Sequence, residues 1–177
     1  YDISIVCFNK KNWIGNGMLL PAGPLREKLS SLKNYDIVFF VGNDENVSRH
    51  KEELKNINPN IDIFDAKYEP VNLEDFDKNK NYFAFSGVGN HETFLDTLRL
   101  AKLNIVENKE FPDHFDYSST DIKNLIEYTN DNKLDLVTTK KDFIKIDKLS
   151  LNKIKYLDIN LVIKDEIKLL KKIIWKV

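Results

Sequence analysis

Short apolar runs alternate along the chain with segments whose apolar residues recur at helical spacing. The apolar runs predict strands at residues 3–8, 36–41, 61–64, 82–86, 104–107, 135–138 and 159–163. The segments between them predict helices at residues 24–32, 47–56, 92–102, 120–130 and 165–176. Pro24 suits the first position of the first helix, because the N–H that proline lacks would have no partner there. Ser119 or Thr120 is expected to cap the fourth helix.

This alternation predicts an α/β fold, namely a mostly parallel sheet with helices on both faces. The runs at 37–41 and 134–137 are apolar without alternation, as expected for strands that are buried on both faces. Residues 66–81 are polar and loop-like, and we expect an excursion there between two halves of the sheet. At 177 residues, the chain fits one domain, or a domain with a small appendage.

Composition excludes several classes of protein. The net charge of -1 argues against a general nucleic-acid binder, since phosphate backbones select a basic face. No run approaches the roughly 18 apolar residues that a membrane-spanning helix needs, and no signal peptide is visible. The single cysteine, Cys7, rules out a disulfide framework and is expected to be buried. Because the chain opens on Tyr1 and the first strand follows at once, we expect the natural N-terminus to lie upstream.

Glycine and proline are concentrated in the stretch IGNGMLLPAGPLREKL, residues 14–29. Gly15 and Gly17 permit backbone angles that other residues resist. The start of the predicted helix would present free N–H groups and a partial positive charge to an anion. Arg26 could fork onto phosphate oxygens, while Glu27 could orient it or contact a sugar hydroxyl. A tight structural turn with a surface arginine is equally compatible with this spacing.

Two further turns follow predicted strands, at the edge where parallel sheets bind ligands. Gly87 and Gly89 in YFAFSGVGNHETF would let a ligand approach the backbone. This turn lacks the third glycine of a dinucleotide fingerprint and the Lys-Ser/Thr of a P-loop, so a plain structural turn is favoured. His91 is expected at the surface, where the next helix starts.

The second of these turns, FPDHFDY, spans residues 111–117. Histidine is the side chain most easily tuned to exchange protons near neutral pH. His114 follows Asp113 in a loop that Pro112 fixes, and this position makes it a candidate for acid–base chemistry. The alternative is a histidine satisfied by local hydrogen bonds. His50 lies in a polar helix and is assigned no role.

The remaining patterns point to structure more than to chemistry. In LVTTKKDFIKI, Thr138 and Thr139 are expected to cap a helix, with phosphate contact by a following lysine as the alternative. No Cys/His cluster has metal-ligand spacing, and no nucleophile elbow is present. Packing of the final helix on the sheet is favoured over membrane contact, which its lysines leave as an option. The apolar face expected on this helix consists of Ile167, Leu170, Ile173, Ile174 and Val177.

Four ordered blocks resemble the C-terminal portion of the tetraacyldisaccharide 4'-kinases, the lipid A 4'-kinases. They are GNGMLLPAGPLRE (15–27), FSGVGNHETF (85–94), FPDHFDY (111–117) and LVTTKKDFIKI (136–146). The resemblance implies transfer of the γ-phosphate of ATP to the 4'-hydroxyl of a tetraacyl disaccharide 1-phosphate, with Mg²⁺. It also implies the fold of a two-lobed P-loop kinase, with the nucleotide in the interlobe cleft. The implied location is the cytoplasmic face of the bacterial inner membrane.

The resemblance also implies roles for particular residues. His114 matches the histidine of the family's Pro-Asp-His block, which is thought to assist the aspartate base that activates the sugar hydroxyl. Asp113 and Asn90 are assigned supporting roles at the same site. The residues expected to contact the nucleotide and its phosphates are Gly15, Gly17, Arg26 and Glu27.

The chain departs from the family pattern in several ways. The P-loop, the base aspartate and the Mg²⁺-binding acids belong to the family's N-terminal lobe, and no G-x-x-x-x-G-K-[ST] occurs in these 177 residues. Lys140 stands where the family usually has Glu, and Asn9 where Asp is common. We expect residues 1–34 to be a remnant of the N-terminal lobe with its phosphate-contacting loop, and residues 35–177 to be the C-terminal α/β lobe.

Three hypotheses follow. In the first, the chain completes an ATP site when an N-terminal lobe is supplied in cis or in trans, and lacks kinase activity alone. Its partners would be ATP, a lipid A disaccharide precursor and that lobe, which would hold Mg²⁺, with peripheral membrane contact as an option. In the second, the chain is a catalytically dead folded remnant that at best binds a nucleotide or partner. The third and weaker hypothesis is an unrelated nucleotide-sugar-binding domain.

Overall fold

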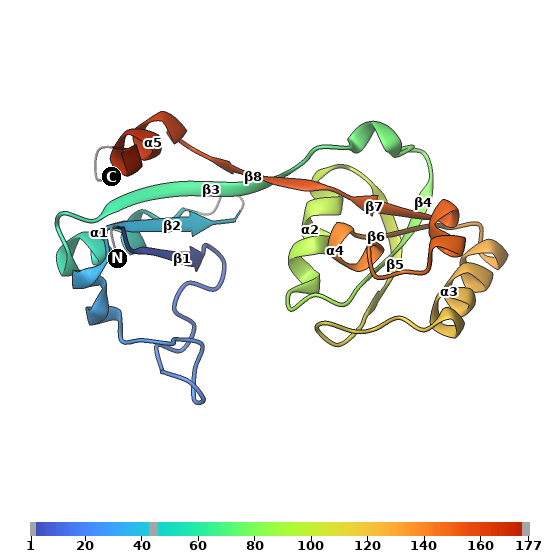
Figure 1. Cartoon of the computed structure of the whole chain (residues 1–177), viewed down its shortest axis with the longest axis horizontal. Helices are drawn as coiled ribbons and strands as arrows, with labels where there is room; N and C mark the ends of the chain where they lie inside the picture. Colours follow the sequence, from blue (N-terminus) through green and yellow to red (C-terminus); the bar gives the residue numbers. More distant parts are fainter. Residues whose placement is uncertain (1–2, 43–45, 175–177) are drawn as a thin grey trace. The chain divides into compact units, whose positions relative to one another are not determined.

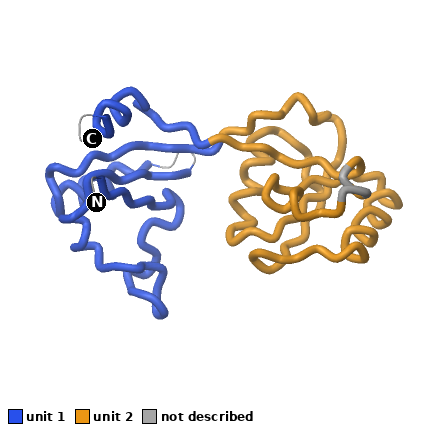
Figure 2. Tube along the Cα trace, viewed as in Figure 1, with its two compact units in different colours: residues 1–68, 161–177 blue, residues 69–160 orange. Residues whose placement is uncertain are grey.

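The computed structural model describes residues 3–42 and 46–174, which divide into two compact units (Figure 1, Figure 2). Unit 1 comprises residues 1–68 and 161–177, and unit 2 comprises residues 69–160. Parallel sheets flanked by helices confirm the predicted α/β class. The prediction of one sheet in two halves is wrong, because the strands form two separate four-stranded sheets.

Unit 1 is built on a sheet with the strand order β1-β2-β3-β8, in which β1, β2 and β3 are parallel. Two of its strands, β3 and β8, also carry the chain from one unit to the other. The elements are β1 (Ile5–Asn9), the 3-10 helix η1 (Leu29–Asn34), β2 (Ile37–Val41), α1 (Ser48–Ile57), β3 (Asp62–Pro70), β8 (Ile159–Ile163) and α5 (Glu166–Ile174).

The core of unit 1 lies on both faces of β2, which is why that strand is apolar throughout. Phe39 packs in a cluster with Leu169 of α5, whereas Phe40 packs in another with Leu54 of α1. β1 is an edge strand, and Cys7 on it is exposed. The expectation of a buried thiol is therefore wrong, because the strand that carries it has a neighbour on one side only within its sheet.

The C-terminal helix α5 presents a different face to the sheet than the one predicted. Leu169 is buried and Ile173 packs beside it, whereas three of the residues expected on the packed face, Ile167, Leu170 and Ile174, are exposed. Ion pairs account for this orientation, because Lys168 and Lys172 both pair with Asp62 of β3. The face of the helix that carries Leu169 and Ile173 is therefore turned toward the sheet. Val177 lies outside the described residues.

Unit 2 is built on a parallel sheet with the strand order β5-β4-β6-β7. Helices cover both of its faces: Ala84 packs with Leu95 of α2 on one, and Phe85 packs with Leu125 of α3 on the other. The elements are η2 (Leu73–Asp75), β4 (Asn81–Ser86), α2 (His91–Leu100), β5 (Asn104–Glu110), α3 (Ser119–Asp131), β6 (Asp135–Thr139), α4 (Lys140–Phe143), η3 (Lys148–Lys153) and β7 (Ile154–Leu157).

Several predicted boundaries shift. β3 continues to Pro70 because β8 pairs beside it, so residues 66–70 are strand and not part of an excursion. Ser118, one residue before the predicted position, caps α3 in a reciprocal capping box with Asp121. The short strand β7 was not predicted. The expectation that residues 1–34 derive from the N-terminal lobe and residues 35–177 form the C-terminal lobe stays a prediction. In the structure, residues 1–68 belong to one compact unit.

Candidate functional site

The glycine- and proline-rich loop of unit 1 closes on itself instead of starting a helix. The N–H of Leu25 donates to the carbonyl of Met18 (3.2 Å), and the N–H of Leu20 donates to the carbonyl of Leu25 (2.8 Å). The first helical residue is Leu29, in η1. The helix predicted at 24–32 is therefore wrong over its first five positions, and Arg26 does not sit in the first turn of a helix.

Gly15 and Gly17 shape this loop. Their φ angles of 58° and 74° lie in the left-handed region, where glycine is favoured. Their N–H groups donate to the carbonyls of Asn12 (2.8 Å) and Ile14 (3.0 Å). These donors are thus engaged in turns, and the contact of both glycines with phosphate stays a prediction.

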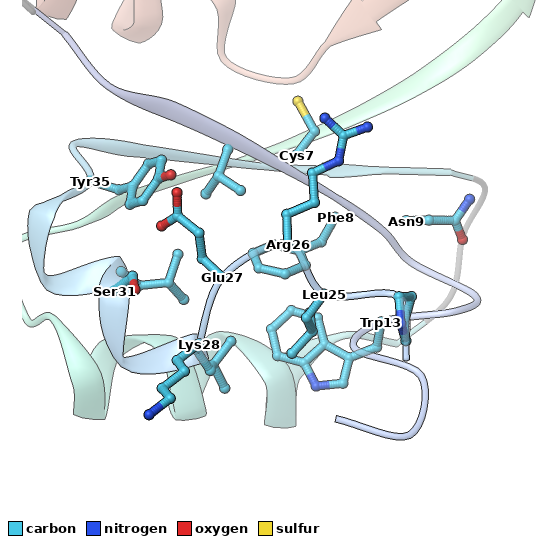
Figure 3. Close-up of a pocket in the computed structure, with 14 residues that line it drawn as sticks. Cys7, Phe8, Asn9, Trp13, Leu25, Arg26, Glu27, Lys28, Ser31 and Tyr35 are labelled. Atoms are coloured by element: carbon cyan, nitrogen blue, oxygen red, sulfur yellow. The ribbon is translucent and has the colours of Figure 1, made fainter. Parts of the chain in front are cut away.

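A pocket of about 360 Å³ lies alongside β1, and both Arg26 and Glu27 line it (Figure 3). The Glu27 carboxylate is turned toward the Tyr35 hydroxyl, whereas Arg26 extends separately. Burial and the neighbouring Glu27 carboxylate raise the pKa of Tyr35. The structure therefore brings the predicted Arg26 and Glu27 to one cavity, while Gly15 and Gly17 do not line it.

Asn9, which stands where the family commonly has aspartate, lines the same pocket. Its Oδ1 accepts the N–H groups of Lys11 (2.9 Å) and Asn12 (3.1 Å), and so closes the turn after β1. An aspartate carboxylate could accept both bonds equally well. This departure therefore preserves the local backbone and removes one negative charge from the pocket.

In unit 2, the segments that follow β4, β5 and β6 meet at the carboxyl edge of the sheet. The N–H of His114 donates to the carbonyl of Gly87 (3.0 Å), and the N–H of Gly87 donates to Asp142 Oδ2 (3.0 Å). Lys141 Nζ lies 3.7 Å from Asp113 Oδ1. Three blocks that the sequence presents separately are thus joined in one place, as expected for parallel strands.

His114 stands at the surface of this edge, with 72% of its side chain exposed. Its Nε2 lies 3.8 Å from Asp113 Oδ2. The backbone at His114 has a φ of 62°, a left-handed conformation that few non-glycine residues adopt. The loop therefore presents the His114 imidazole to solvent, with the Asp113 carboxylate and Lys141 beside it. This arrangement is suited to proton exchange with an anionic ligand.

The neighbouring residues have structural roles. Asn90, the predicted support, caps α2 by accepting the N–H of Thr93 (3.0 Å). His91 was expected at the surface but is buried, because its ring lies 2.7 Å from Ser86 Oγ and 3.1 Å from Asn108 Oδ1. Its position at the first turn of α2 directs the ring into the unit, against the end of β4.

The fourth block also resolves into separate roles. Thr139 caps α4, as predicted, whereas Thr138 is buried and donates to the carbonyl of Phe85 (2.8 Å). Lys140, the departure from the family's Glu, pairs with Asp158 at 2.6 Å. Lys141 reaches Asp113 of the histidine loop.

Asp142 is the residue of this edge that the sequence reasoning missed. It is fully buried, and its Oδ2 binds the N–H of Gly87 and the hydroxyl of Thr139. The available signal was its spacing: an acid three residues after a threonine matches the capping-box pattern. That pattern places an acid at a helix start but does not distinguish an exposed one from a buried one.

Over the described residues, no group of three or more His, Cys, Asp or Glu side chains is arranged to hold a metal ion. The described residues therefore offer no such group for Mg²⁺, and no chemical step is assigned to the ion. Within the same residues, no helix is both long and apolar enough to cross a membrane. Arg26 belongs to unit 1 and His114 to unit 2.

Comparison with known proteins places these observations in a family. A family model described as tetraacyldisaccharide-1-P 4'-kinase matches residues 1–177. A tetraacyldisaccharide 4'-kinase of Pelagibacter ubique (strain HTCC1062) is 47% identical over 174 residues, which are 98% of this chain and 55% of that protein. The enzyme of the same name from Rickettsia bellii (strain OSU 85-389) is 45% identical over 149 residues, 82% of this chain and 44% of its own.

A solved structure agrees with the sequence matches. The crystal structure of LpxK from Aquifex aeolicus in complex with ATP has a TM-score of 0.62 and 25% identity, covering 99% of this chain and 52% of that one. The chain thus spans about half the length of the curated relatives it matches. On the match over its whole length, the chain belongs to the tetraacyldisaccharide 4'-kinase family.

Proposed function

We propose that this chain is one part of an ATP-dependent kinase that phosphorylates the 4'-hydroxyl of a tetraacyldisaccharide 1-phosphate, and that it is inactive alone. The observation that carries the proposal is the exposed Asp113–His114 pair, held at the carboxyl edge of unit 2 with Lys141 beside it. This edge is where parallel sheets take their ligands. The family membership supplies the reaction.

The two sites divide the chemistry between them. Phosphoryl transfer depends mainly on positioning and on neutralising the charge that develops on the phosphoryl oxygens. Arg26, at the pocket beside β1, supplies a guanidinium that binds phosphate oxygens, with Glu27 as a neighbouring support. His114 takes up a proton with Asp113 beside it, and so assists the base that activates the sugar hydroxyl. The base and the Mg²⁺ ligands come from an N-terminal lobe.

The edge strand β1 supports completion by such a lobe. Ile5 is 44% exposed and Cys7 is exposed on the same face, although their partners on β2 are buried. A parallel strand with an open edge and an apolar face is uncommon, because parallel sheets are normally covered on both faces. A lobe that pairs with β1 would cover both features.

The outward face of α5 supports contact with a membrane surface at the cytoplasmic side. Ile167, Leu170 and Ile174 are 71%, 47% and 68% exposed and recur at helical spacing on a lysine-rich helix. A helix of this type lies in the interface with its apolar side chains among the acyl chains, and Lys171 would lie near anionic headgroups, while Lys168 and Lys172 stay with Asp62. Such contact suits an enzyme whose substrate carries four acyl chains.

Complementation tests the proposal. The chain is mixed with the N-terminal half of the Pelagibacter ubique relative, and the transfer of labelled phosphate from ATP to the tetraacyldisaccharide 1-phosphate is measured. Activity is expected in the mixture and in neither part alone. The single thiol, Cys7, reports assembly in the same sample, because its reaction with a maleimide should slow when β1 is covered.

The second candidate is a folded remnant without catalysis, which the departure at Asn9 favours because it removes a carboxylate from the pocket. In that case Cys7 becomes protected in the mixture but no phosphate is transferred. If Cys7 stays reactive and no phosphate is transferred, both the assembly and the kinase function are contradicted.

A further inference from the structure

A carboxylate lies buried directly behind the exposed histidine loop. Asp142 is 0% exposed, although acidic side chains are rarely buried to this extent. Its Oδ2 accepts two hydrogen bonds, from the N–H of Gly87 (3.0 Å) and from the hydroxyl of Thr139 (2.8 Å). A buried carboxylate contributes less to stability than an apolar side chain of the same volume commonly does, so its presence points to a geometric role.

The contacts of Asp142 extend to the loop that carries His114. The N–H of Gly87 donates to Asp142, and the carbonyl of Gly87 accepts the N–H of His114 at 3.0 Å. Lys145 Nζ lies 3.9 Å from Asp142 Oδ1 and donates to the carbonyl of Phe115 (3.2 Å). Asp142 therefore reaches the histidine loop from two sides.

Close packing around Gly87 leaves little room for a side chain at this position. A Cβ atom added to Gly87 would lie 3.1 Å from the carbonyl of Pro112 and 3.1 Å from the Tyr117 hydroxyl. Burial, and then the negative charge of Asp142, raise the pKa of Tyr117, so this hydroxyl stays protonated. Neither the Tyr117 hydroxyl nor Asp142 Oδ1 has a hydrogen-bond partner among the described residues.

We propose that Asp142 is a positioning residue, which fixes the backbone of His114 through Gly87. The proposal deepens the function proposed above and rests on it only for the role of His114. Without Asp142, the buried N–H of Gly87 loses its acceptor, and the turn that receives the His114 N–H is free to move. His114 is then held less firmly in the left-handed conformation that presents its ring, because its N–H keeps only the bond to Asp113 Oδ1 (3.0 Å) in place of two acceptors.

Backbone hydrogen exchange separates positioning from general stability. In Asp142→Ala, the amides of Gly87 and His114 are expected to lose protection by about tenfold or more, because exchange follows local opening. The amides of Ala84 and Val137, inside the same sheet, should keep theirs. The matched control is Asp135→Ala, which removes a carboxylate paired with Lys80 at the other end of β6 and should leave the histidine loop unchanged.

The conservative variant keeps the test informative if the alanine variant does not fold. Asp142→Asn retains an oxygen acceptor for Gly87 and loses the charge opposite Lys145. It is expected to restore most of the protection at Gly87 and to keep the imidazole NMR signals of His114 close to those of the unmodified protein, whereas Asp142→Ala shifts them and leaves those of the buried His91 unchanged. In Asp142→Ala, equal loss at all amides of unit 2, no loss at Gly87 and His114, or unshifted His114 signals would each overturn the proposal. Lost protection at Gly87 in a folded Asp142→Asn variant would overturn it as well.

The complemented enzyme supplies an independent readout. There, Asp142→Ala should lower kcat with little change in the KM for ATP, because a displaced His114 affects the chemical step and not nucleotide binding, whereas Asp142→Asn should retain most of the kcat. Absence of kinase activity in the unmodified mixture would contradict the proposed function alone. The exchange and NMR measurements need no activity, so the two failures are distinguishable.

Discussion

The two candidate sites differ in what holds them in place. The Arg26 pocket of unit 1 is bounded by a loop whose hydrogen bonds run mostly between its own residues, such as Leu25 to Met18. The His114 edge of unit 2 is anchored to strand ends and to a buried carboxylate on α4. A loop that depends on itself can readjust around a ligand, whereas an edge fixed by strands presents its groups in one geometry. This contrast agrees with the proposal that the first site binds the ligand and the second takes part in the chemistry.

Substitutions at His114 and Arg26 should change the kinetics most and test this division of roles. In the complemented enzyme, His114→Ala should lower kcat by about 10²–10⁴-fold, the range for a group that takes part in proton transfer. Arg26→Ala should mainly raise the KM for ATP and lower kcat/KM by roughly 10–100-fold, because it removes a charged hydrogen bond to the ligand. Steady-state kinetics with varied ATP separates the two.

The control is Arg99→Ala, which removes an exposed arginine that pairs with Glu92 and Asp96 on α2 and should change neither constant. If Arg26→Ala instead lowers kcat and His114→Ala raises only KM, the assignment of the two sites is reversed. Unchanged kinetics in both variants would mean that neither residue has the predicted role.

The same contrast explains what the sequence could and could not predict. Phe85 and the glycines after it belong to a strand–turn–helix segment, in which apolar periodicity and turn chemistry indicate the same structure. The residues around Pro24 carry a helix-start pattern, but a hydrogen bond from Leu25 to the distant Met18 decides the backbone there. Periodicity reports local preference, and a loop closed by contacts six or seven residues apart overrides it.

The exposure of individual side chains at the candidate sites could not be predicted from the sequence either. Cys7 and His91 were expected in the opposite environments from those observed, because burial depends on strand order and helix orientation. An apolar run predicts a strand but not whether it lies at an edge. The meeting of Gly87, His114 and Asp142 follows from the order of β4, β5 and β6 in the sheet, which only the structure supplies.

A second comparison concerns the stability of the two units. Phe85 of unit 2 and Phe40 of unit 1 are both 0% exposed, so truncation of either to alanine should lower the free energy of unfolding by about 3–5 kcal/mol. If each unit has its own core, Phe85→Ala should reduce amide protection in β4 and β6 but not in β2, and Phe40→Ala should do the reverse. Equal loss in both sheets after one substitution would show that the units unfold together.

The weakest of the predicted effects is a loss of stability of unit 1 at acid pH. Burial alone would raise the pKa of Asp62, but hydrogen bonds and charges from Lys172 and Lys168 lower it below its ordinary value. Asp65 behaves likewise, since burial is outweighed by Lys51 and Lys10. A carboxyl group whose pKa is depressed by folding contributes stability that is present above its unfolded pKa, about 4, and is lost as pH falls through the folded value.

Unit 1 should therefore lose amide protection below about pH 4 before unit 2 does, because these two carboxylates hold α5 and α1 to β3. Asp62→Asn should remove part of this sensitivity and cost less than about 1 kcal/mol at neutral pH, since partly exposed ion pairs contribute little. The measurement is hydrogen exchange at β2 and at β4 across an acid titration. Earlier loss in β4 would mean that another group governs acid unfolding, and that the ion pairs of β3 do not distinguish the two units.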